Sequence, residues 1–291
     1  MATLEISGIK GFKGAELIVK TCYCNRDFTE AEVTKIITEL RKRDNIRLEQ
    51  QYQVKDPIYI TKDGTKVIKL GKEFYTLDRK TKITDANVIT GIVKYKIEKN
   101  KFDDLGTTIF QSKKIEKIQT NDANLTTFTK ELNAAFKKYE INTCIRKIHF
   151  LAQSYHESQR FQVSYESNPN ATVIGGEHYR GRGLLQLTHD YNYEKFYKDL
   201  NSKKPSDKEL FDFAPKVAKE LHFAIYASAF YWKNIGSKRG NISQFADKDD
   251  VLTVSKEING YVKTPYGYTE RVLYTNQLKT IMTYDKCAIK K

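Results

Sequence analysis

Glu157 is the residue of this chain best placed to act as an acid or a base. It follows the run 150–156, which begins apolar and ends with His156. A carboxylate at the end of an otherwise apolar helix costs free energy unless it is solvated or used. The catalytic interpretation competes with one in which Glu157 only pairs with Arg160 or Arg182 at the surface.

His156 and Glu157 also begin the pattern His-Glu-x-x-His of zinc proteases, in which a second histidine completes the metal site. Position 160 holds Arg160 instead. Zinc-protease chemistry of this kind is therefore excluded.

A second motif covers residues 179–188, Tyr-Arg-Gly-Arg-Gly-Leu-Leu-Gln-Leu-Thr, and is followed by Tyr-Asn-Tyr at 191–193. Gly181 and Gly183 flank Arg182, which predicts a tight backbone held close to another element. No strand is expected before these glycines and no Lys-Ser/Thr pair follows them, so we exclude a phosphate-binding P-loop. The polar side chains that follow are expected to face a cleft.

Together the two motifs resemble family 19 of the glycoside hydrolases, the group of plant-type chitinases and phage-type endolysins. In that family a helix with His-Glu-Ser or His-Glu-Thr supplies the general acid, and a Tyr-x-Gly-Arg-Gly-x-x-Gln-Leu-(Thr or Ser)-x-x-x-Asn-Tyr segment lines the cleft. The segment Glu-Ile-Asn-Gly at 257–260 is similar to the Ile-Asn-Gly-Gly of the family, with Tyr261 where a second glycine is usual. The resemblance covers residues 25–46 and 121–282.

The resemblance implies a role for each matching residue. Glu157 would be the general acid, and Thr188 would help to hold the attacking water. The expected substrate contacts are Tyr179, Arg182, Gln186, Tyr191, Asn192, Asn259 and Arg271. This chemistry requires neither a metal nor an organic cofactor.

A second carboxylate is needed if the reaction inverts the anomeric centre, with the base about 6.5 to 9.5 Å from the acid. Glu166, nine residues after Glu157, is the preferred base. The chain can turn to bring it across a cleft if the helix ends near Phe161. Glu177 and Asp190 are the alternatives.

Hydrophobic periodicity predicts the elements that position these residues. Thr29 and Glu32 form a capping box before a helix over 30–43. Strand-like segments follow at 59–61, 66–68, 74–76 and 91–95, and the turn Asp63-Gly64 separates the first two. One helix is expected to end near Glu140, and the next to carry Glu157 near its C-terminal end. Others are expected to cover about 192–200, 215–232 and 249–259.

The sequence therefore predicts an α+β fold, with a mainly α-helical, lysozyme-like catalytic core and a β-rich insertion. We expect an N-terminal segment at 1–24, the first helix of the catalytic domain at 25–47, the insertion at 48–120 and the rest of the core at 121–291.

Charge and cysteine content constrain the partners. The net charge of +14 would attract polyanions, but the basic residues are spread along the chain, so no nucleic-acid partner is expected. Cys22, Cys24, Cys144 and Cys287 are expected to be reduced thiols. Since Cys22 and Cys24 have no nearby partner at zinc spacing, no metal site is expected.

Residues 1–20 contain no apolar core of a secretory signal, and no stretch of the sequence approaches the length of a membrane span. We therefore expect a protein that does not insert into membranes. We also expect it to be a monomer. It would be made in the cytoplasm and act on the cell wall after lysis or secretion that does not use the Sec route.

The predicted function is cleavage of β-1,4 bonds in peptidoglycan by an inverting mechanism, as a muramidase-type endolysin or an antibacterial effector. An effector would need an immunity protein, and a secretion-system component would be a further partner. Residues 132–136 and 139–143 resemble the helix and turn that precede the acid in phage-type members of the family. This resemblance, the lack of a cysteine-rich chitin-binding module and the basic charge favour peptidoglycan over chitin. A chitinase remains the alternative within the same class, and a catalytically silent wall-binding module is the alternative of another class.

Overall fold

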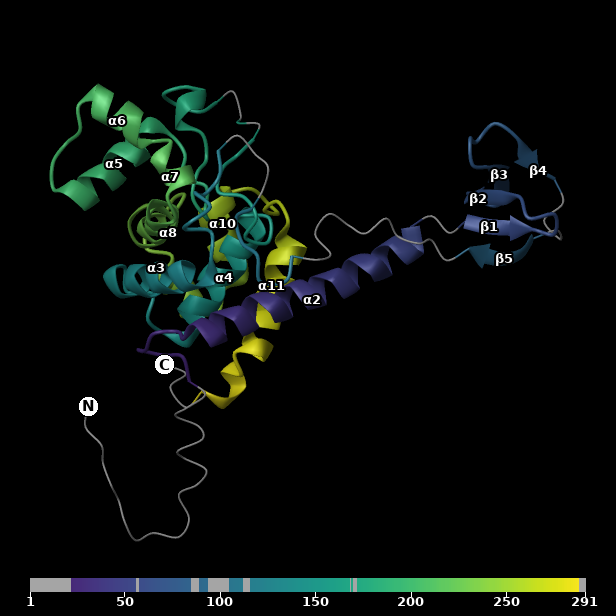
Figure 1. Ribbon diagram of the computed structural model, residues 1–291, viewed down its shortest axis with the longest axis horizontal. Coiled ribbons are helices and arrows are strands. Elements are labelled where there is room, and N and C mark those ends of the chain that lie inside the picture. The colour runs from purple at the N-terminus through teal and green to yellow at the C-terminus, as the bar shows by residue number, and fades with distance from the viewer. Residues whose placement is uncertain are drawn as a thin grey trace, which may run out of the picture. The chain divides into compact units, whose positions relative to one another are not determined.

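The computed structural model of the chain describes residues 22–55, 58–84, 89–93, 105–111, 116–167, 169 and 172–287 (Figure 1). Most of the expected N-terminal segment, 1–24, lies outside the described residues. The chain divides into two compact units, Arg41–Gly106 and Met1–Leu40 with Thr107–Lys291. Among the described residues, no helix combines the length and the apolar character needed to cross a membrane.

The smaller unit contains a five-stranded antiparallel sheet in the order β4-β3-β2-β1-β5. Its strands are β1 (Ile58–Thr61), β2 (Lys66–Leu70), β3 (Glu73–Thr76), β4 (Lys82–Ile83) and β5 (Ile89–Val93). The turn after β1 needs Gly64, whose φ is +84°, and Asp63 accepts a hydrogen bond from the Thr65 backbone at 3.2 Å. The four predicted strand segments are confirmed, except that residues 94 and 95 of the last one lie outside the described residues.

Helix α2 (Glu30–Lys55) begins at the predicted capping box and extends past the predicted end. The Thr29 backbone donates to the Glu32 carboxylate at 2.9 Å, and the Glu32 backbone donates to the Thr29 hydroxyl at 3.2 Å. The boundary between the two units falls within α2, after Leu40.

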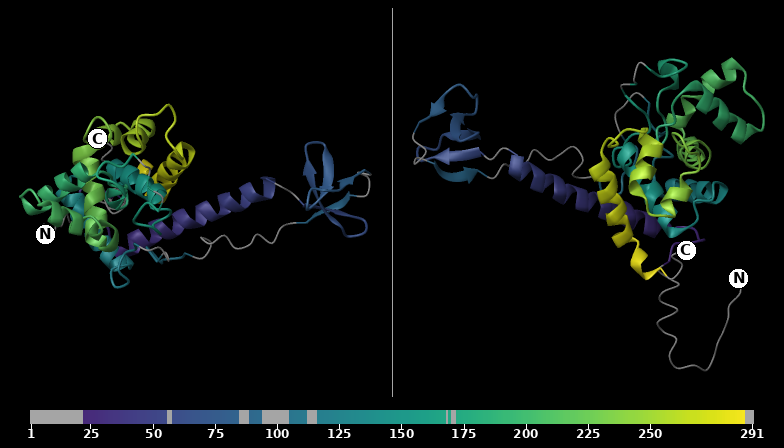
Figure 2. Two further views of the ribbon diagram at one scale, coloured as in Figure 1. Left: turned by 90° about the horizontal axis from the view of Figure 1, so that it is seen from above. Right: turned by 180° about the vertical axis from the view of Figure 1, so that it is seen from behind.

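The core of the larger unit is built around α3 (Leu125–Lys138), α4 (Cys144–Glu157) and α8 (Leu221–Phe230). Phe150 of α4 packs edge-on against Phe136 of α3, with ring centroids 5.2 Å apart, and against Trp232, at 5.6 Å. Helix α11 (Tyr268–Ile281) packs along α4 (Figure 2), and Tyr155 meets Tyr274 with centroids 4.8 Å apart. This packing on several sides fixes the helix that carries Glu157.

The remaining helices of the larger unit are η2 (Glu177–Tyr179), α5 (Asp190–Asn201), α6 (Asp207–Phe213), α7 (Lys216–Lys219), η3 (Tyr231–Ile235), α9 (Ser243–Ala246), α10 (Val251–Asn259) and η4 (Tyr284–Lys286). The expected helices over 192–200, 215–232 and 249–259 are confirmed, the second as α7, α8 and the start of the π-helix η3. The α+β fold class, a mainly helical core with a β-rich insertion, is therefore confirmed.

Helices α6 and α11 were not predicted. The buried face of α11 consists of Arg271, Tyr274, Thr275, Leu278 and Ile281, a helical spacing interrupted by two polar residues. Because an arginine and a threonine occupy inward positions, the apolar pattern of this helix is weak.

Residues 107–120 lie inside the expected insertion at 48–120 but belong to the larger unit. Ile109 and Phe110 are buried in its core, and the Phe110 backbone donates to the Phe161 carbonyl at 2.9 Å. The Gln119 backbone donates to the Lys219 carbonyl at 2.9 Å. This stretch is therefore part of the structure that supports the site.

Candidate active site

Glu157 is the last residue of α4, and a sharp reversal of the chain follows it. The Ser158 hydroxyl donates to the Ser154 carbonyl at 2.6 Å and accepts from the Phe161 backbone at 3.1 Å. Gln159, Arg160 and Phe161 all have positive φ, at 49°, 67° and 58°. Such backbone is costly for residues other than glycine and persists only where the surrounding structure enforces it.

Arg271 of α11 holds the Glu157 carboxylate in place. One terminal guanidinium nitrogen of Arg271 donates to Glu157 and the other donates to the Gln153 side-chain carbonyl, while Nε donates to the Tyr266 carbonyl at 2.9 Å. The Arg271 side chain has no exposed surface, whereas that of Glu157 is 18% exposed. Every guanidinium nitrogen of Arg271 is thus bonded inside the protein, and the expected contact with substrate stays a prediction.

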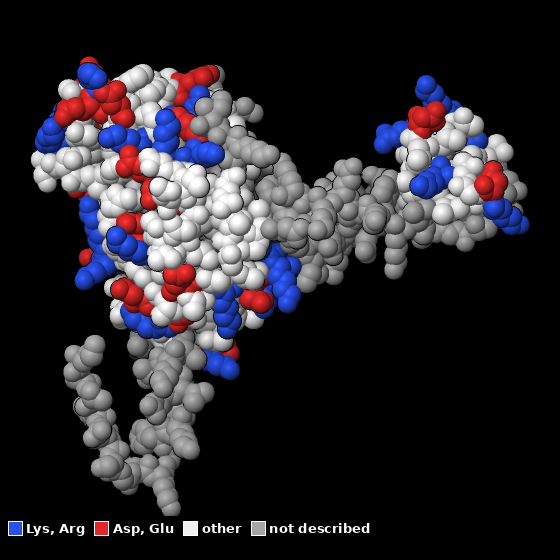
Figure 3. All heavy atoms as spheres, in the orientation of Figure 1, with Lys and Arg blue, Asp and Glu red and all other residues white. Residues whose placement is uncertain are grey.

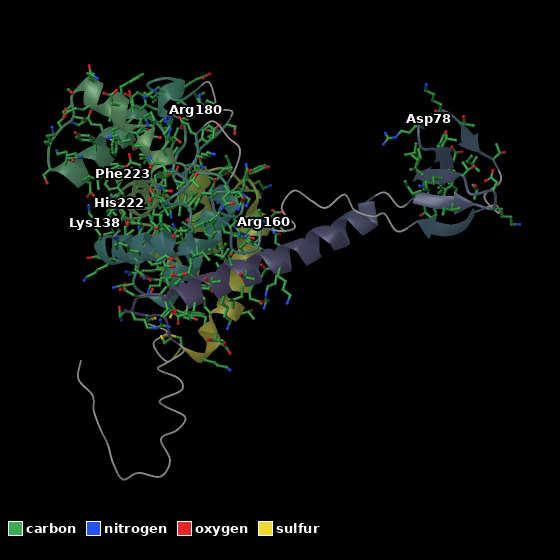
Figure 4. The ribbon with its side chains drawn as sticks, viewed as in Figure 1. Asp78, Lys138, Arg160, Arg180, His222 and Phe223 are labelled. Atoms are coloured by element: carbon green, nitrogen blue, oxygen red, sulfur yellow. A yellow bond between two sulfur atoms is a disulfide. The ribbon has the colours of Figure 1, made fainter. Side chains whose placement is uncertain are left out.

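Glu157 pairs with this distant arginine and not with the two that its sequence neighbourhood suggested. Arg160 is buried, and its Nε donates to the Tyr155 hydroxyl at 3.1 Å. Figure 4 labels Arg160 in the larger unit. The polar environment of Glu157 thus depends on α11, an element that the sequence did not predict.

Arg182 also differs from its expected role as a substrate contact. Its side chain is only 2% exposed, and it forms a two-pronged ion pair with Glu116, at 2.7 and 3.0 Å. Its remaining nitrogen donates to the His178 carbonyl at 2.6 Å and to the Tyr193 hydroxyl at 3.3 Å. Arg182 therefore stabilises the motif through buried contacts with Glu116, His178 and Tyr193. Sequence reasoning missed Glu116 because it lies in the segment assigned to the insertion.

The two glycines of the motif permit the close approach that the sequence predicted. A Cβ atom on Gly183, whose φ is +80°, would lie 2.8 Å from the Ala224 carbonyl of α8. A Cβ atom on Gly181 would lie 2.8 Å from the side-chain oxygen of Gln186 and 3.2 Å from the Thr188 hydroxyl. Gly183 meets backbone and has a positive φ, so only glycine lets the segment lie this close to α8, whereas the nearest atom at Gly181 is the end of the Gln186 side chain.

Glu166 lies beside Gly181. The Glu166 backbone donates to the Gly181 carbonyl at 2.8 Å, and the Glu166 carboxylate accepts from the Gly181 backbone at 3.4 Å. The Thr188 hydroxyl, which approaches the same glycine, donates to the Gln186 carbonyl at 2.7 Å. Glu166 and Thr188 are thus both neighbours of Gly181.

The two alternative carboxylates have other surroundings. The Glu177 side chain is 78% exposed and pairs with Arg180 at 3.3 Å. Asp190 begins α5, and its carboxylate accepts from the Tyr191 backbone at 2.6 Å.

A cavity of about 430 Å³ lies in the larger unit beside this motif. Five of the sequence-predicted residues line it: Gln186, Thr188, Tyr191, Asn192 and Asn259. The sequence analysis did not single out the other polar lining residues, His189, Lys195, Tyr231, Asn234 and Ser237, as site residues. Residues from three separate parts of the chain thus form one polar cavity.

Two buried amide oxygens at this cavity, Oε1 of Gln186 and Oδ1 of Asn192, accept no hydrogen bond from the residues that the structure describes. Each amide is oriented by its nitrogen, since Gln186 donates to the Gly183 carbonyl at 3.2 Å and Asn192 donates to the Thr188 carbonyl at 2.8 Å. An unsatisfied buried acceptor costs about 1–3 kcal/mol. Gln186 also has a positive φ of 57°. These two acceptors and the backbone of Gln186 mark this part of the motif as strained.

Tyr191 provides an exposed aromatic ring at the cavity. It is 43% exposed and stacks on His189, with centroids 5.3 Å apart and planes at 12°. Lys195 lies 5.6 Å from the centre of the ring. Tyr179, by contrast, packs against Tyr193 at 5.7 Å and does not line this cavity. Of these two expected aromatic contacts, only Tyr191 is presented to the cavity.

Tyr231 connects the cavity to Glu157 electrostatically. Burial raises the pKa of the Tyr231 phenol well above its usual range, and the nearby charges of Glu257 and Glu157 raise it further. The Tyr231 hydroxyl donates to the Glu257 carbonyl at 2.9 Å. Glu157 itself is not among the residues that line this cavity, but its charge acts on Tyr231, which is one of them.

Glu257 is a fully buried carboxylate that sequence reasoning did not single out. It accepts from the backbones of Lys238 and Arg239, at 2.9 and 3.1 Å, and from the Tyr261 hydroxyl. Burial and this hydrogen bond raise the pKa of Tyr261 to about 12. Tyr261, at the position of the usual second glycine, thus helps to anchor Glu257.

Asn259 of the same segment accepts from the Tyr266 backbone at 2.7 Å.

No protein-family model and no curated protein matches the sequence. Solved structures similar to this chain include a class IV chitinase of glycoside hydrolase family 19 from Zea mays and chitinase C from Streptomyces griseus. Both are 19% identical to it, with a TM-score of 0.42, over 53% of this chain and over 80% and 83% of their own lengths. These values describe a likeness of fold, and the function proposed below rests on the residues of the site.

Proposed function

We propose that this protein is a glycoside hydrolase that cleaves β-1,4 bonds in an N-acetylated aminosugar polymer. The observation that carries the proposal is the polar cavity, which is lined by the motif residues Gln186, Thr188, Tyr191, Asn192 and Asn259. Amide and hydroxyl side chains of this kind can hydrogen-bond the hydroxyl and acetamido groups of a sugar. The ring of Tyr191 offers an apolar face to a sugar.

In the proposed mechanism Glu157 protonates the glycosidic oxygen, and the Arg271 guanidinium orients the Glu157 carboxyl by direct contact. Glu166 acts as the base that activates a water molecule, and Thr188 helps to hold this water. Attack from the face opposite the leaving group would invert the anomeric centre in a single displacement. The hydrogen bond from the Gly181 backbone to Glu166 supports the base role, because it fixes this carboxylate beside the glycine that the Thr188 hydroxyl also approaches.

The proposed substrate is the glycan strand of peptidoglycan, which the protein would cleave as an endolysin or an antibacterial effector. The net charge of +14 supports an anionic polymer over neutral chitin. Figure 3 shows acidic and basic side chains intermixed on the face that it presents, so the attraction is ascribed to net charge and not to a single basic patch.

The test compares the loss of turbidity of purified peptidoglycan with the release of reducing ends from colloidal chitin, for the wild type and Glu157→Gln. Clearing of the wall by the wild type, without clearing by Glu157→Gln, would support the proposal. If the protein released reducing ends from chitin but did not clear the wall, the glycoside hydrolase activity would stand, and the assignment of peptidoglycan as substrate would be wrong. If the protein bound the wall but released no product from either polymer, the proposed catalytic function would be wrong, and the protein would be a wall-binding module.

A further inference from the structure

All four cysteines of the chain meet at one place in the larger unit. Their sulfur atoms lie within 4.8 Å of one another, and all four residues are buried. Figure 4 shows yellow sulfur atoms where the purple chain before α2 meets the yellow C-terminal end. The argument that Cys22 and Cys24 have no metal-binding partner is therefore wrong, because Cys144 and Cys287 approach them from distant parts of the sequence.

The arrangement brings together more sulfur atoms than a disulfide uses. Cys22 and Cys287 form a disulfide in the structure, and Cys24 and Cys144 lie outside it. The sulfur of Cys144 nevertheless lies 3.0 Å from that of Cys24, 3.5 Å from that of Cys22 and 3.4 Å from that of Cys287. Four thiolates around a tetrahedral zinc, with bonds of about 2.3 Å, have sulfur atoms about 3.8 Å apart. The cluster thus has close to the dimensions of a zinc site.

The surroundings of the cluster also suit a negatively charged centre. The Tyr23 backbone donates to the sulfur of Cys144 at 3.2 Å, and the Cys144 backbone donates to the sulfur of Cys24 at 3.0 Å. Such N–H···S bonds orient and stabilise metal-bound thiolates. Cys144 is the first residue of α4, where the helix dipole favours negative charge. One turn later the buried Lys147 ammonium donates to the carbonyls of Tyr23 and Arg26, at 2.7 and 2.6 Å.

We propose that Cys22, Cys24, Cys144 and Cys287 bind one zinc ion as four thiolates. The disulfide is then the oxidised, metal-free alternative of the same cluster. Reduction of this disulfide by a thiol reductant adds two electrons and two protons, and zinc binding to the four thiols releases four protons. With four protein ligands the zinc has no open position, so its role is structural and it takes no part in hydrolysis.

The zinc ion would fix both ends of the described chain to the helix that carries Glu157. Cys144 and Glu157 are the first and last residues of the 14-residue α4, so about 20 Å of helix separates their backbones. Cys287 follows α11, the helix that supplies Arg271. The metal site would therefore hold the α4 and α11 pair together from the end opposite to the candidate active site.

The test begins with the full chain purified under a thiol reductant and without chelator. Elemental analysis after desalting should find one zinc per chain, or one after incubation with zinc chloride. Replacement by cobalt should give the intense visible bands of a tetrahedral tetrathiolate site. Removal of zinc by a chelator under reducing conditions should lower the unfolding temperature, because binding to the folded state alone stabilises it.

Cys144→Ser and Cys24→Ser should each lose stoichiometric zinc. Thr143→Ala is the matched control, since it removes the hydroxyl that accepts from the Arg146 backbone at 3.3 Å at the start of α4 but leaves all four sulfur atoms. This variant should be less stable and still hold one zinc. Retention of one zinc by Cys144→Ser, or failure of the reduced wild type to retain any after zinc is added, would overturn the proposal. Because the wild-type measurement needs no variant, misfolding of a serine variant leaves the proposal testable.

Discussion

Arg271 and Glu157 are 114 residues apart in sequence, yet a guanidinium nitrogen of the buried arginine donates directly to the carboxylate. Two adjacent helices supply them, and Gln153 and the Tyr266 carbonyl complete the set of acceptors around the arginine. The position of the candidate acid is therefore set by the packing of α11 on α4. It is not a property of the local sequence around Glu157.

Glu157→Gln should abolish hydrolysis. The amide matches the carboxyl in shape and can still accept from Arg271, but it cannot deliver the proton that the leaving group needs. We expect a loss of at least about 100-fold in rate. Loss of the negative charge beside buried Arg271 should also lower stability, by up to about 3 kcal/mol. Clearing of purified wall and thermal unfolding should be measured together. Activity within about tenfold of the wild type, a change of about 1.4 kcal/mol, would remove Glu157 from the acid role.

Arg271→Lys should lower kcat and leave KM nearly unchanged. A single ammonium keeps the charge but cannot reach Glu157, Gln153 and the Tyr266 carbonyl at once. Lys279→Met is a control on the same helix, because Lys279 pairs with Asp249 at the surface. The control should resemble the wild type in steady-state kinetics on soluble glycan fragments. A large rise in KM at constant kcat would show that Arg271 contacts substrate after all.

Glu116→Gln should destabilise the protein without a primary effect on KM. It leaves the buried Arg182 without a counter-charge, which costs about 3 kcal/mol or more. Asp212→Asn, which removes an exposed partner of Lys208, should leave the unfolding temperature close to that of the wild type. If Arg182 were mainly a sugar contact, Glu116→Gln would change KM more than stability.

The same pair predicts a pH dependence. Burial raises the pKa of Glu116, but the hydrogen bonds and charge of Arg182 outweigh this and lower it below the ordinary 4.5. A lowered pKa contributes stability that is present above the unfolded value and is lost as the pH falls through the folded value. The stability of the wild type should therefore decline below pH 4.5, and Glu116→Gln should show a shallower decline over that range.

The stereochemistry of the product tests the role of Glu166. If Glu166 activates water opposite Glu157, a β-linked substrate should first release an α-configured reducing end, which proton NMR can detect before mutarotation. Glu166→Ala should slow this reaction severely. Glu177→Ala is the control and should change it little, because that side chain is 78% exposed. A predominantly β product would exclude the inverting role, and normal activity in Glu166→Ala would move the base to another carboxylate.

Replacement of residues 46–103 by a short Gly-Ser linker should leave a folded protein that still cuts soluble glycan fragments. Arg41 donates to the Gly106 carbonyl at 2.9 Å, so a short linker can join the two ends. The deletion spares residues 107–120, which include Glu116 and the buried Phe110. Circular dichroism and product analysis would check it. A folded protein without activity would show that the β-rich unit contributes to catalysis.

The local parts of the structure were predictable from the sequence. The capping box at Thr29, the helix that ends at Glu157 and the four strand segments depend on neighbouring residues and on short periodicities. The close approaches at Gly181 and Gly183 followed from the lack of a side chain at those positions. Gln186, Thr188, Tyr191 and Asn192 lie together with Asn259 of the 257–260 segment in one cavity, and the roles assigned to them remain predictions.

The tertiary pairings could not be predicted in this way. Arg182 and Arg271 look like cleft residues in the sequence, but partners 66 and 114 residues away bury both. Helix α11 was missed because two of its inward positions are polar. The four cysteines have no regular spacing along the chain, and only the folded structure brings their sulfur atoms together.

The meeting of Cys22 and Cys287 also determines how the protein would respond to mechanical force. Their α-carbons are 5.0 Å apart although 265 positions separate them in sequence. A pull applied through both ends of the chain would be carried first by the sulfur cluster, whether a disulfide or a metal joins it. The helices that hold Glu157 and Arg271 would bear no load until that link broke. An enzyme tethered through its ends to a surface or to a wall fragment would thus keep its candidate active site unstrained under tension.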